Sequence, residues 1–224
     1  MAVLDAGCGT GSITAGMAAA VGPAGRVTGL DRDESLIAIA RHEHAGVTNL
    51  GFETGDLLTL GRVGRFDIVT AARLIQWIGN PAEAIGRMAM ATRPGGRVVV
   101  LDYNHDLNSW TPEPPAEFRR FWSAFLDWRG ACGWDNRMGD HLHALFEDAG
   151  LKQVTTYSDD ELVRRGEPEF AGASAIWLHV IQTLGPSFMT DEAERLGVET
   201  AYAEYAGQRL ETQCLSMRTT IGEA

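Results

Sequence analysis

A short apolar segment followed at once by three alternating glycines opens the chain, and it constrains the fold more than any other feature. The segment AVLDAG over residues 2–7 is typical of a buried strand, and a run of helix-forming residues follows the glycines Gly7, Gly9 and Gly11. A strand, a glycine loop and a helix in this order allow the backbone to approach a nucleotide-like ligand closely. The opening therefore predicts a cofactor-binding α/β protein.

Strands and helices alternate through the first half of the chain. Apolar periodicity predicts further strands over 25–31, 47–56, 65–72 and 95–103, and helices over 12–22, 33–46 and 80–91. Asn80 can cap the last of these helices, and Pro81 suits its first turn. Strands and helices at this spacing form right-handed crossovers, so we expect a Rossmann-like, doubly wound, mostly parallel sheet with its ligand at the carboxyl ends of the strands.

The second half of the chain departs from this alternation. A Pro-rich stretch and an aromatic helix share residues 105–136, and further elements are predicted as a helix over 140–150, a strand over 153–159 and helices over 169–185 and 191–208. The terminal TQCLSMRTTI places Leu215, Met217, Thr219 and Ile221 at every second position, which predicts one closing antiparallel strand. We expect a single domain over 1–224, with core segments 1–104, 137–168 and 209–222, an aromatic lid insert at 105–136 and a helical insert at 169–208.

Composition narrows the classes of partner. The formal charge of −11, without a basic run, disfavours nucleic acid. No apolar run approaches the roughly 20 residues of a bilayer span, and no export signal is recognisable, so we expect a cytoplasmic protein without a membrane partner. Cys8, Cys132 and Cys214 are too scattered for a disulfide framework or a zinc site. The oligomeric state does not follow from the sequence.

Acidic residues at successive strand ends distinguish between two kinds of cofactor. The glycine spacing is G-x-G-x-G, and Ser12 stands where a dinucleotide fingerprint has its third glycine. Asp5 lies two residues before the loop, where its charge repels a pyrophosphate and favours a cationic ligand. Asp31 can bind the ribose of a dinucleotide or of an adenosyl sulfonium and does not distinguish the two. Asp56 can accept a hydrogen bond from an adenine amino group. Three such carboxylates favour an adenosyl sulfonium.

In these residues the chain resembles the class I S-adenosylmethionine-dependent methyltransferases. The resemblance is strongest in VLDAGCGTG, VTGLD, GDLL and FDIVTAARLIQW, and it weakens beyond Asp102. It implies S-adenosyl-L-methionine as the cofactor and a seven-stranded sheet with the order 3-2-1-4-5-7-6, whose last strand is antiparallel. The family normally has a few dozen residues before the first strand, so we predict that residues are missing upstream, an N-terminal covering helix among them.

The resemblance also implies which residues hold the cofactor. The backbone around Gly7, Gly9 and Gly11 would admit the methionine part and the ribose, with Asp5 near the amino group. Asp31 would bind the ribose, and Asp56 with Leu57 the adenine. The backbone of Ala72 and Arg73 would touch the methionine part. The predicted cofactor set is completed by their neighbours Cys8, Arg32 and Gly55.

Aromatic residues and one histidine are the candidates for the acceptor site. His105 follows the fifth predicted strand at the ligand side, and we predict that it acts as a base or orients the acceptor. The predicted acceptor contacts are aromatic and belong to the strand ends or the insert: Trp77, Tyr103, Trp110, Phe121, Trp122 and Phe125. Their helical spacing also fits ordinary core packing. An apolar or aromatic small molecule is the favoured acceptor, with no metal required.

Two other classes of protein stay open. A cofactor-binding protein without catalysis would carry the same loop and carboxylates. A nicotinamide-dependent oxidoreductase of the common short-chain type needs a Tyr-x-x-x-Lys pair, and the chain's single lysine, Lys152, has no tyrosine four residues before it. The acceptor atom and the substrate do not follow from the sequence.

Overall fold

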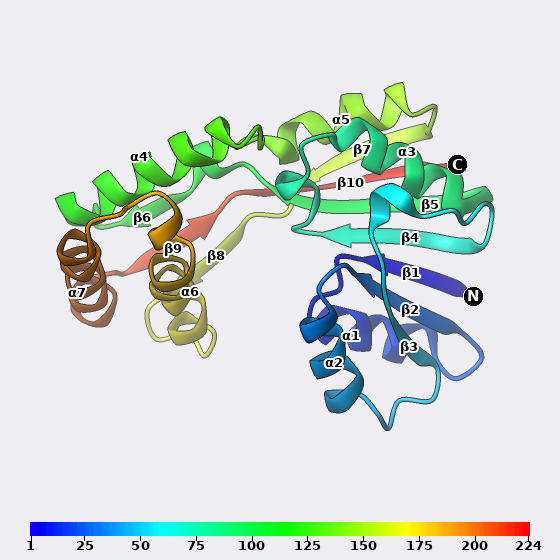
Figure 1. Ribbon diagram of the computed structural model, residues 1–224, viewed down its shortest axis with the longest axis horizontal. Helices are drawn as coiled ribbons and strands as arrows, with labels where there is room; N and C mark the ends of the chain where they lie inside the picture. Colours follow the sequence, from blue (N-terminus) through cyan, green and yellow to red (C-terminus); the bar gives the residue numbers. More distant parts are fainter. The chain divides into compact units, whose positions relative to one another are not determined.

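The computed structural model describes residues 1–224, which form two compact units (Figure 1). Unit 1 comprises Met1–Tyr103, Met138–Ser158 and Arg218–Ala224, and unit 2 comprises Asn104–Arg137 and Asp159–Met217. The predicted single domain with its lid and helical inserts stays a prediction.

Unit 1 is built on a seven-stranded sheet with the order β3-β2-β1-β4-β5-β10-β7. The strands are Ala2–Ala6 (β1), Arg26–Asp31 (β2), Leu50–Thr54 (β3), Phe66–Ala72 (β4), Thr92–Tyr103 (β5), Lys152–Ser158 (β7) and Met217–Glu223 (β10). β1 pairs in parallel with β2 and β4, and the same holds for β2 with β3 and β4 with β5, whereas β10 is antiparallel to β7. Because β7 and β10 are the sixth and seventh strands of this sheet along the chain, the expected order 3-2-1-4-5-7-6 is confirmed.

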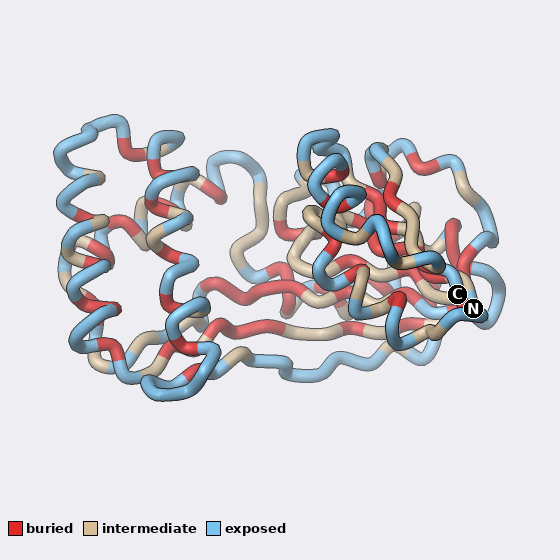
Figure 2. The backbone as a smooth tube through the Cα atoms, turned by 90° about the horizontal axis from the view of Figure 1, so that it is seen from below, coloured by how far each residue is buried: buried red, intermediate tan, exposed pale blue.

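Helices cover both faces of this sheet (Figure 1). On one face α1 (Ser12–Val21) and α2 (Glu34–Glu43) lie against β1 to β3, and on the other α3 (Pro81–Ala91) and α5 (Met138–Asp148) lie against β4, β5 and β7. The larger core forms on the α3 and α5 side, where Val69, Ile85 and Phe146 are fully buried. Buried residues accordingly concentrate along the strands (Figure 2).

The helix starts follow their capping residues. The side chain of Asn80 accepts a hydrogen bond from the Glu83 N–H at 3.2 Å, and Pro81 occupies the first turn of α3, as predicted.

α2 ends at Glu43, three residues before the predicted Gly46. Its cap residue His44 turns its imidazole Nε2 to the Thr10 carbonyl at 3.2 Å, so the histidine joins the end of α2 to the glycine loop.

Unit 2 combines three long helices with a small sheet. The helices are α4 (Ala116–Ala131), α6 (Phe170–Thr183) and α7 (Glu192–Gln208). The sheet has the order β6-β9-β8, in which β9 (Thr212–Leu215) pairs antiparallel with both β6 (Ser109–Thr111) and β8 (Glu161–Arg164). Phe118, Phe121 and Tyr202 are fully buried where α4 meets α7. None of the chain's helices combines the length and the apolar character that crossing a bilayer requires.

The prediction of one closing strand is wrong. The terminal segment forms two strands, β9 in the small sheet and β10 in the large one, and Ser216 separates them. The N–H of Ser216 donates to the side chain of Asn108 at 2.8 Å, and its hydroxyl donates to Asp160 at 2.9 Å. These bonds satisfy the polar groups of the buried serine outside any strand pairing, so the chain passes from one sheet to the other at this residue.

Candidate functional site

The glycine loop between β1 and α1 is held in a left-handed backbone conformation. The φ angles of Gly7, Gly9 and Gly11 are 72°, 54° and 84°, which glycine adopts without the steric penalty of a Cβ atom. A Cβ atom on Gly7 would lie 2.8 Å from the side chain of Leu74, and one on Gly11 would lie 2.6 Å from the ring of Phe52. At Gly9 such an atom would meet nothing within 4 Å, so the backbone there is open to a ligand.

Asp31 ties this loop to the end of β2. One oxygen of its carboxylate accepts a hydrogen bond from the Gly9 N–H at 2.9 Å, and the other accepts from the Asp33 N–H at 2.9 Å. The loop is fastened a second time through the Leu30 carbonyl, which accepts from the N–H groups of Gly7 and Cys8. The glycine loop is therefore preorganised before a ligand arrives.

Asp5 is buried at the end of β1, with an exposed fraction of 2%. The hydroxyl of Thr14 donates to one of its oxygens at 2.7 Å, and the hydroxyl of Thr70 donates to the other at 3.0 Å. Burial raises the pKa of this carboxyl, although the two hydrogen bonds act in the opposite direction. The side chain thus joins β1 to α1 and β4 and places an acidic group next to the loop.

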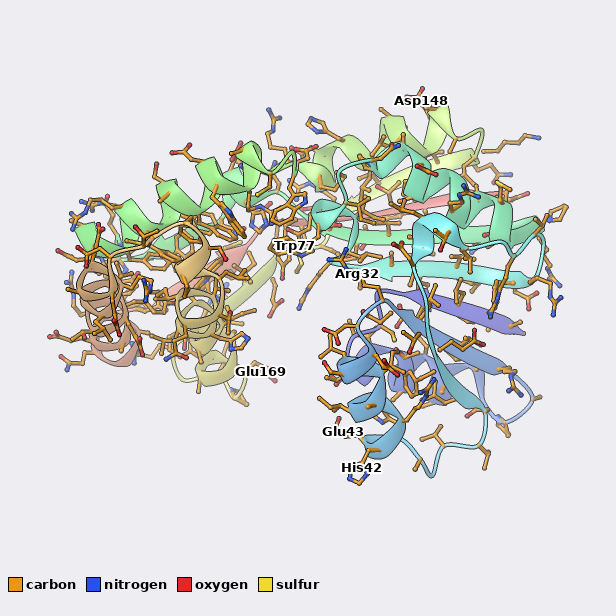
Figure 3. The ribbon with its side chains drawn as sticks, viewed as in Figure 1. Arg32, His42, Glu43, Trp77, Asp148 and Glu169 are labelled. Atoms are coloured by element: carbon orange, nitrogen blue, oxygen red, sulfur yellow. The ribbon has the colours of Figure 1, made fainter.

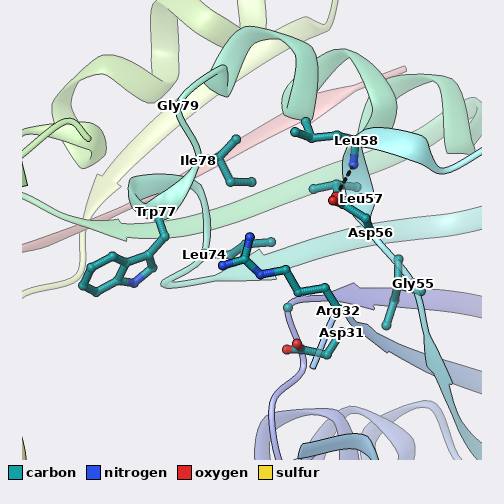
Figure 4. A pocket seen from close by; sticks show the side chains of 12 residues that line it. Asp31, Arg32, Gly55, Asp56, Leu57, Leu58, Leu74, Trp77, Ile78 and Gly79 are labelled. Carbon is teal, nitrogen blue, oxygen red and sulfur yellow. Dashed lines mark hydrogen bonds between the residues drawn. The ribbon is translucent and has the colours of Figure 1, made fainter. Parts of the chain in front are cut away.

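A pocket of about 280 Å³ opens at the carboxyl ends of the first strands (Figure 4). It is lined by Gly7, Leu30, Asp31, Arg32, Gly55, Asp56, Leu57, Leu58, Leu74, Trp77, Ile78 and Gly79. The side chain of Asp56 accepts a hydrogen bond from the Leu58 N–H at 2.8 Å and so caps the short 3₁₀ helix Leu57–Thr59. Arg32 extends its guanidinium across the pocket toward Leu74. The pocket combines apolar walls with two carboxylates, as small-molecule sites generally do.

The pocket brings half of the predicted cofactor residues together. They are Gly7, Asp31, Arg32, Gly55, Asp56 and Leu57, from the ends of three strands. Trp77, predicted as an acceptor contact, lines the same pocket, and it lies with Arg32 at the carboxyl ends of the central strands (Figure 3). The other predicted cofactor residues lie at the ends of β1 and β4 and do not line this pocket: Asp5, Cys8, Gly9, Gly11, Ala72 and Arg73.

Sequence reasoning missed five residues that line the pocket, namely Leu30, Leu58, Leu74, Ile78 and Gly79. The first three adjoin predicted site residues, so their position next to Asp31, Leu57 and Arg73 was the available signal. Ile78 and Gly79 follow the 3₁₀ helix Ile75–Trp77, whose turn was not predicted and carries no periodic pattern.

His105 and most of the predicted acceptor contacts belong to unit 2. His105 is 5% exposed, and its imidazole meets the rings of Trp122 and Phe125 edge-on, with ring centroids 5.9 Å away in both cases. Burial, together with the positive charge of Arg129, lowers the pKa of His105 to about 3. The imidazole is therefore neutral near pH 7, which makes it a weak base and leaves it able to accept a hydrogen bond.

The aromatic residues around His105 pack against one another within unit 2. Trp110 and Trp122 meet edge to face at 5.2 Å, and Phe121 stacks on Phe125 at 6.3 Å. Trp177 of α6 joins this cluster at 4.9 Å from Trp122. Core packing thus accounts for the helical spacing of these residues, and their role toward an acceptor stays a prediction. Trp77 and Tyr103, by contrast, are part of unit 1.

The chain belongs to the family described as "Methyltransferase domain", whose match spans residues 1–150. An uncharacterized 37.1 kDa protein in transposon TN4556 of Streptomyces fradiae is 35% identical over 104 residues, which is 46% of this chain and 30% of that protein. Demethylmenaquinone methyltransferase of Staphylococcus aureus is 34% identical over 100 residues, 44% of this chain and 42% of that enzyme. The matched part thus covers less than half the length of either relative.

Among solved structures, the fold is similar to phosphoethanolamine N-methyltransferase 2 of Haemonchus contortus in complex with phosphomonomethylethanolamine and S-adenosylhomocysteine. The TM-score is 0.61 and the identity 16%, and the superposition covers 100% of this chain and 49% of that one. At this identity the likeness concerns the fold alone.

Proposed function

We propose that the chain binds S-adenosyl-L-methionine in the pocket of unit 1 and transfers its methyl group to an apolar or aromatic small molecule. The observation that carries the proposal is the set of carboxylates at the ends of three neighbouring strands. Asp5 lies near the end of β1, Asp31 ends β2 and Asp56 follows β3, and the last two line the pocket itself. Family membership and the name of the Staphylococcus aureus relative support the same activity.

The residues present fit the cofactor. Asp31 stands beside the open backbone of Gly9, where a ribose can approach, and Asp56 lies farther along the apolar wall, where an adenine ring would pack on Leu57 and Leu58. The negative charge suits a sulfonium and an ammonium group, and it opposes a diphosphate. The glycine loop has the left-handed backbone that a close approach of main chain to ligand requires.

The cofactor, once bound, would supply an electrophilic methyl group on a positively charged sulfur. The protein positions the cofactor and the acceptor and excludes water, because the rate of an in-line displacement rises most when the two reactants are held in line. Leu74, Ile78 and Trp77 provide an apolar boundary at the β4 side of the pocket. Charge disappears as the methyl group leaves sulfur, so a dry wall at this place favours the reaction.

The acceptor is a small molecule in this proposal. The indole of Trp77 at the pocket and the apolar residues beside it favour an acceptor with apolar or aromatic surface. The net charge of −11 argues against nucleic acid. His105, the predicted catalytic residue, would take part as a neutral imidazole that accepts a hydrogen bond, since its pKa of about 3 leaves it a poor proton acceptor.

Isothermal titration with S-adenosylhomocysteine tests the site. Replacing Asp31→Asn removes a charged hydrogen-bond acceptor worth about 1.5–3 kcal/mol, so we expect the dissociation constant to rise about tenfold to a hundredfold. Asp33→Asn is the matched control, because Asp33 caps α2 through Ser35 and Leu36 and asparagine caps equally well. Equal affinities of the two variants would exclude Asp31 from the site.

Turnover then separates an enzyme from a protein that only binds the cofactor. The protein is incubated with methyl-labelled S-adenosyl-L-methionine and a panel of phenols, quinones and amines. We expect transfer of label to at least one apolar or aromatic acceptor. Tight binding of the cofactor without transfer to any member of such a panel would favour the non-catalytic alternative.

A further inference from the structure

The imidazole of His44 is hydrogen-bonded to the main chain of the glycine loop. Its Nε2 lies 3.2 Å from the carbonyl oxygen of Thr10, the residue between Gly9 and Gly11. Because a carbonyl oxygen can only accept, Nε2 carries the proton and donates it. No main-chain N–H donates to this carbonyl, so the imidazole is the partner that the fold provides for it.

The neighbours of His44 fix its position against the loop. Its N–H donates to the Ala40 carbonyl of α2 at 3.1 Å, and its own carbonyl accepts from the Val47 N–H at 3.0 Å. The imidazole packs against the ring of Phe52, with ring centroids 5.8 Å apart. Its Cδ2 would lie only 3.1 Å from a Cβ atom on Gly11. The side chain is therefore held beside the loop by packing as well as by its hydrogen bond.

Helix α2 holds the loop through residues at both of its ends. Before its start, the Asp31 carboxylate accepts from the Gly9 N–H at 2.9 Å, and after its last residue His44 donates to the Thr10 carbonyl. Two consecutive loop residues are thus fixed, one through its N–H and one through its carbonyl. Gly9 is also the residue whose backbone is open to a ligand. The part of the loop that a cofactor can approach is therefore the part that α2 holds.

We infer that His44 is a positioning residue for the cofactor, because its hydrogen bond keeps the glycine loop in the conformation that binds the adenosyl donor. The inference rests on the proposed function, in which the cofactor approaches the open backbone of Gly9. His44 does not line the pocket, so it acts through the loop. A released loop samples other conformations, since glycine restricts the backbone less than any other residue. The affinity then falls with the fraction of molecules whose loop is competent to bind.

Three substitutions of His44 separate the donated hydrogen bond from the bulk of the ring. His44→Gln places an amide nitrogen close to the position of Nε2, His44→Asn places one close to Nδ1, and His44→Leu has no donor. The affinity for S-adenosylhomocysteine is measured by isothermal titration. The loss of one neutral hydrogen bond should raise the dissociation constant about threefold to tenfold in His44→Leu and His44→Asn, whereas His44→Gln should stay within about twofold of wild type.

His42→Gln is the matched control. His42 lies in the last turn of α2, and its exposed side chain points away from unit 1 (Figure 3). This variant should keep the wild-type affinity. The melting temperature of every variant is measured without ligand. A residue that only stabilises the fold would lower the melting temperature and leave the affinity unchanged at a temperature far below the transition.

The wild-type titration separates the two proposals. Failure of wild type to bind S-adenosylhomocysteine would overturn the proposed function, and the inference with it. If wild type binds normally, an unchanged affinity in His44→Leu, or an equal loss in His44→Gln, would overturn the inference about His44 alone. Nitrogen NMR shifts of the wild-type imidazole provide a measurement without any substitution. The neutral ring should carry its proton on Nε2, and a proton on Nδ1 would contradict the donated hydrogen bond.

Discussion

Replacing His105 with glutamine tests the burial of its imidazole through the acid stability of unit 2. The pKa of His105 falls from 6.5 to about 3 on folding, first because of burial and second because of Arg129. Below pH 6.5 the unfolded chain takes up a proton at this residue and the folded protein does not. The free energy of unfolding therefore falls as the pH falls from 6.5 toward 3.

The size of the effect follows from the two pKa values. At about pH 4.5, two units below the unfolded pKa, the unfolded state gains about 2.7 kcal/mol from protonation, and at about pH 7 it gains only ~0.2 kcal/mol. Wild type should thus lose about 2.5 kcal/mol more stability than His105→Gln between these pH values. Other acidic groups titrate in both proteins, so the difference in stability loss between wild type and His105→Gln reports on His105 alone.

Urea unfolding followed by tryptophan fluorescence is the assay. Trp77 is the one tryptophan of unit 1, and the remaining five of the six lie in unit 2, so the signal reports mainly on the unit that contains His105. His143→Gln is the control, because the side chain of His143 is 43% exposed. It should show the wild-type acid loss. Equal acid losses in wild type and His105→Gln would refute the buried, neutral imidazole.

Two further predictions concern the glycine loop. Gly11→Ala should destabilise the protein by at least about 2 kcal/mol, because a Cβ atom meets both a left-handed backbone and the ring of Phe52. The control is Gly16→Ala, within α1, where the added atom meets nothing within 4 Å, and it should stabilise the protein by about 0.5–1 kcal/mol. Thermal unfolding measures both variants. Similar losses of stability in both would contradict this account of the loop. Burial raises the pKa of Cys8 to about 12, so at about pH 8 a thiol reagent should modify the exposed Cys132 and spare Cys8, as peptide mapping would reveal. Comparable labelling of the two thiols would mean that the loop opens.

The cofactor half of the fold was predictable because its information is local in the sequence. Each strand of the parallel sheet is an apolar run between turn signals, and right-handed crossovers then limit the strand order. Asp31 and Asp56 fall at strand ends whatever the exact register, so their convergence on one pocket follows from the topology. Gly11 was also predictable, because the turn into α1 follows directly in the sequence and requires the left-handed backbone that glycine adopts.

The remaining features depend on partners that are distant in sequence. Strands β6 and β8 have three and four residues, too few for a periodic signal, so the small sheet was not predicted. Ser216 separates β9 from β10, and its N–H is bonded to Asn108, more than a hundred residues earlier. The two threonines that cover the carboxylate of Asp5 belong to α1 and β4, and only the folded chain brings them to it.

Competition between two ligands measures most directly whether acidic strand ends select an adenosyl donor. The protein is titrated with S-adenosylhomocysteine in the absence and presence of millimolar NAD⁺, and then with NAD⁺ alone. We expect saturable binding of S-adenosylhomocysteine with one site per chain, unchanged by NAD⁺, and no heat from NAD⁺ itself. Saturable binding of NAD⁺ with displacement of the thioether would contradict the assignment of Asp5, Asp31 and Asp56 to a positively charged cofactor.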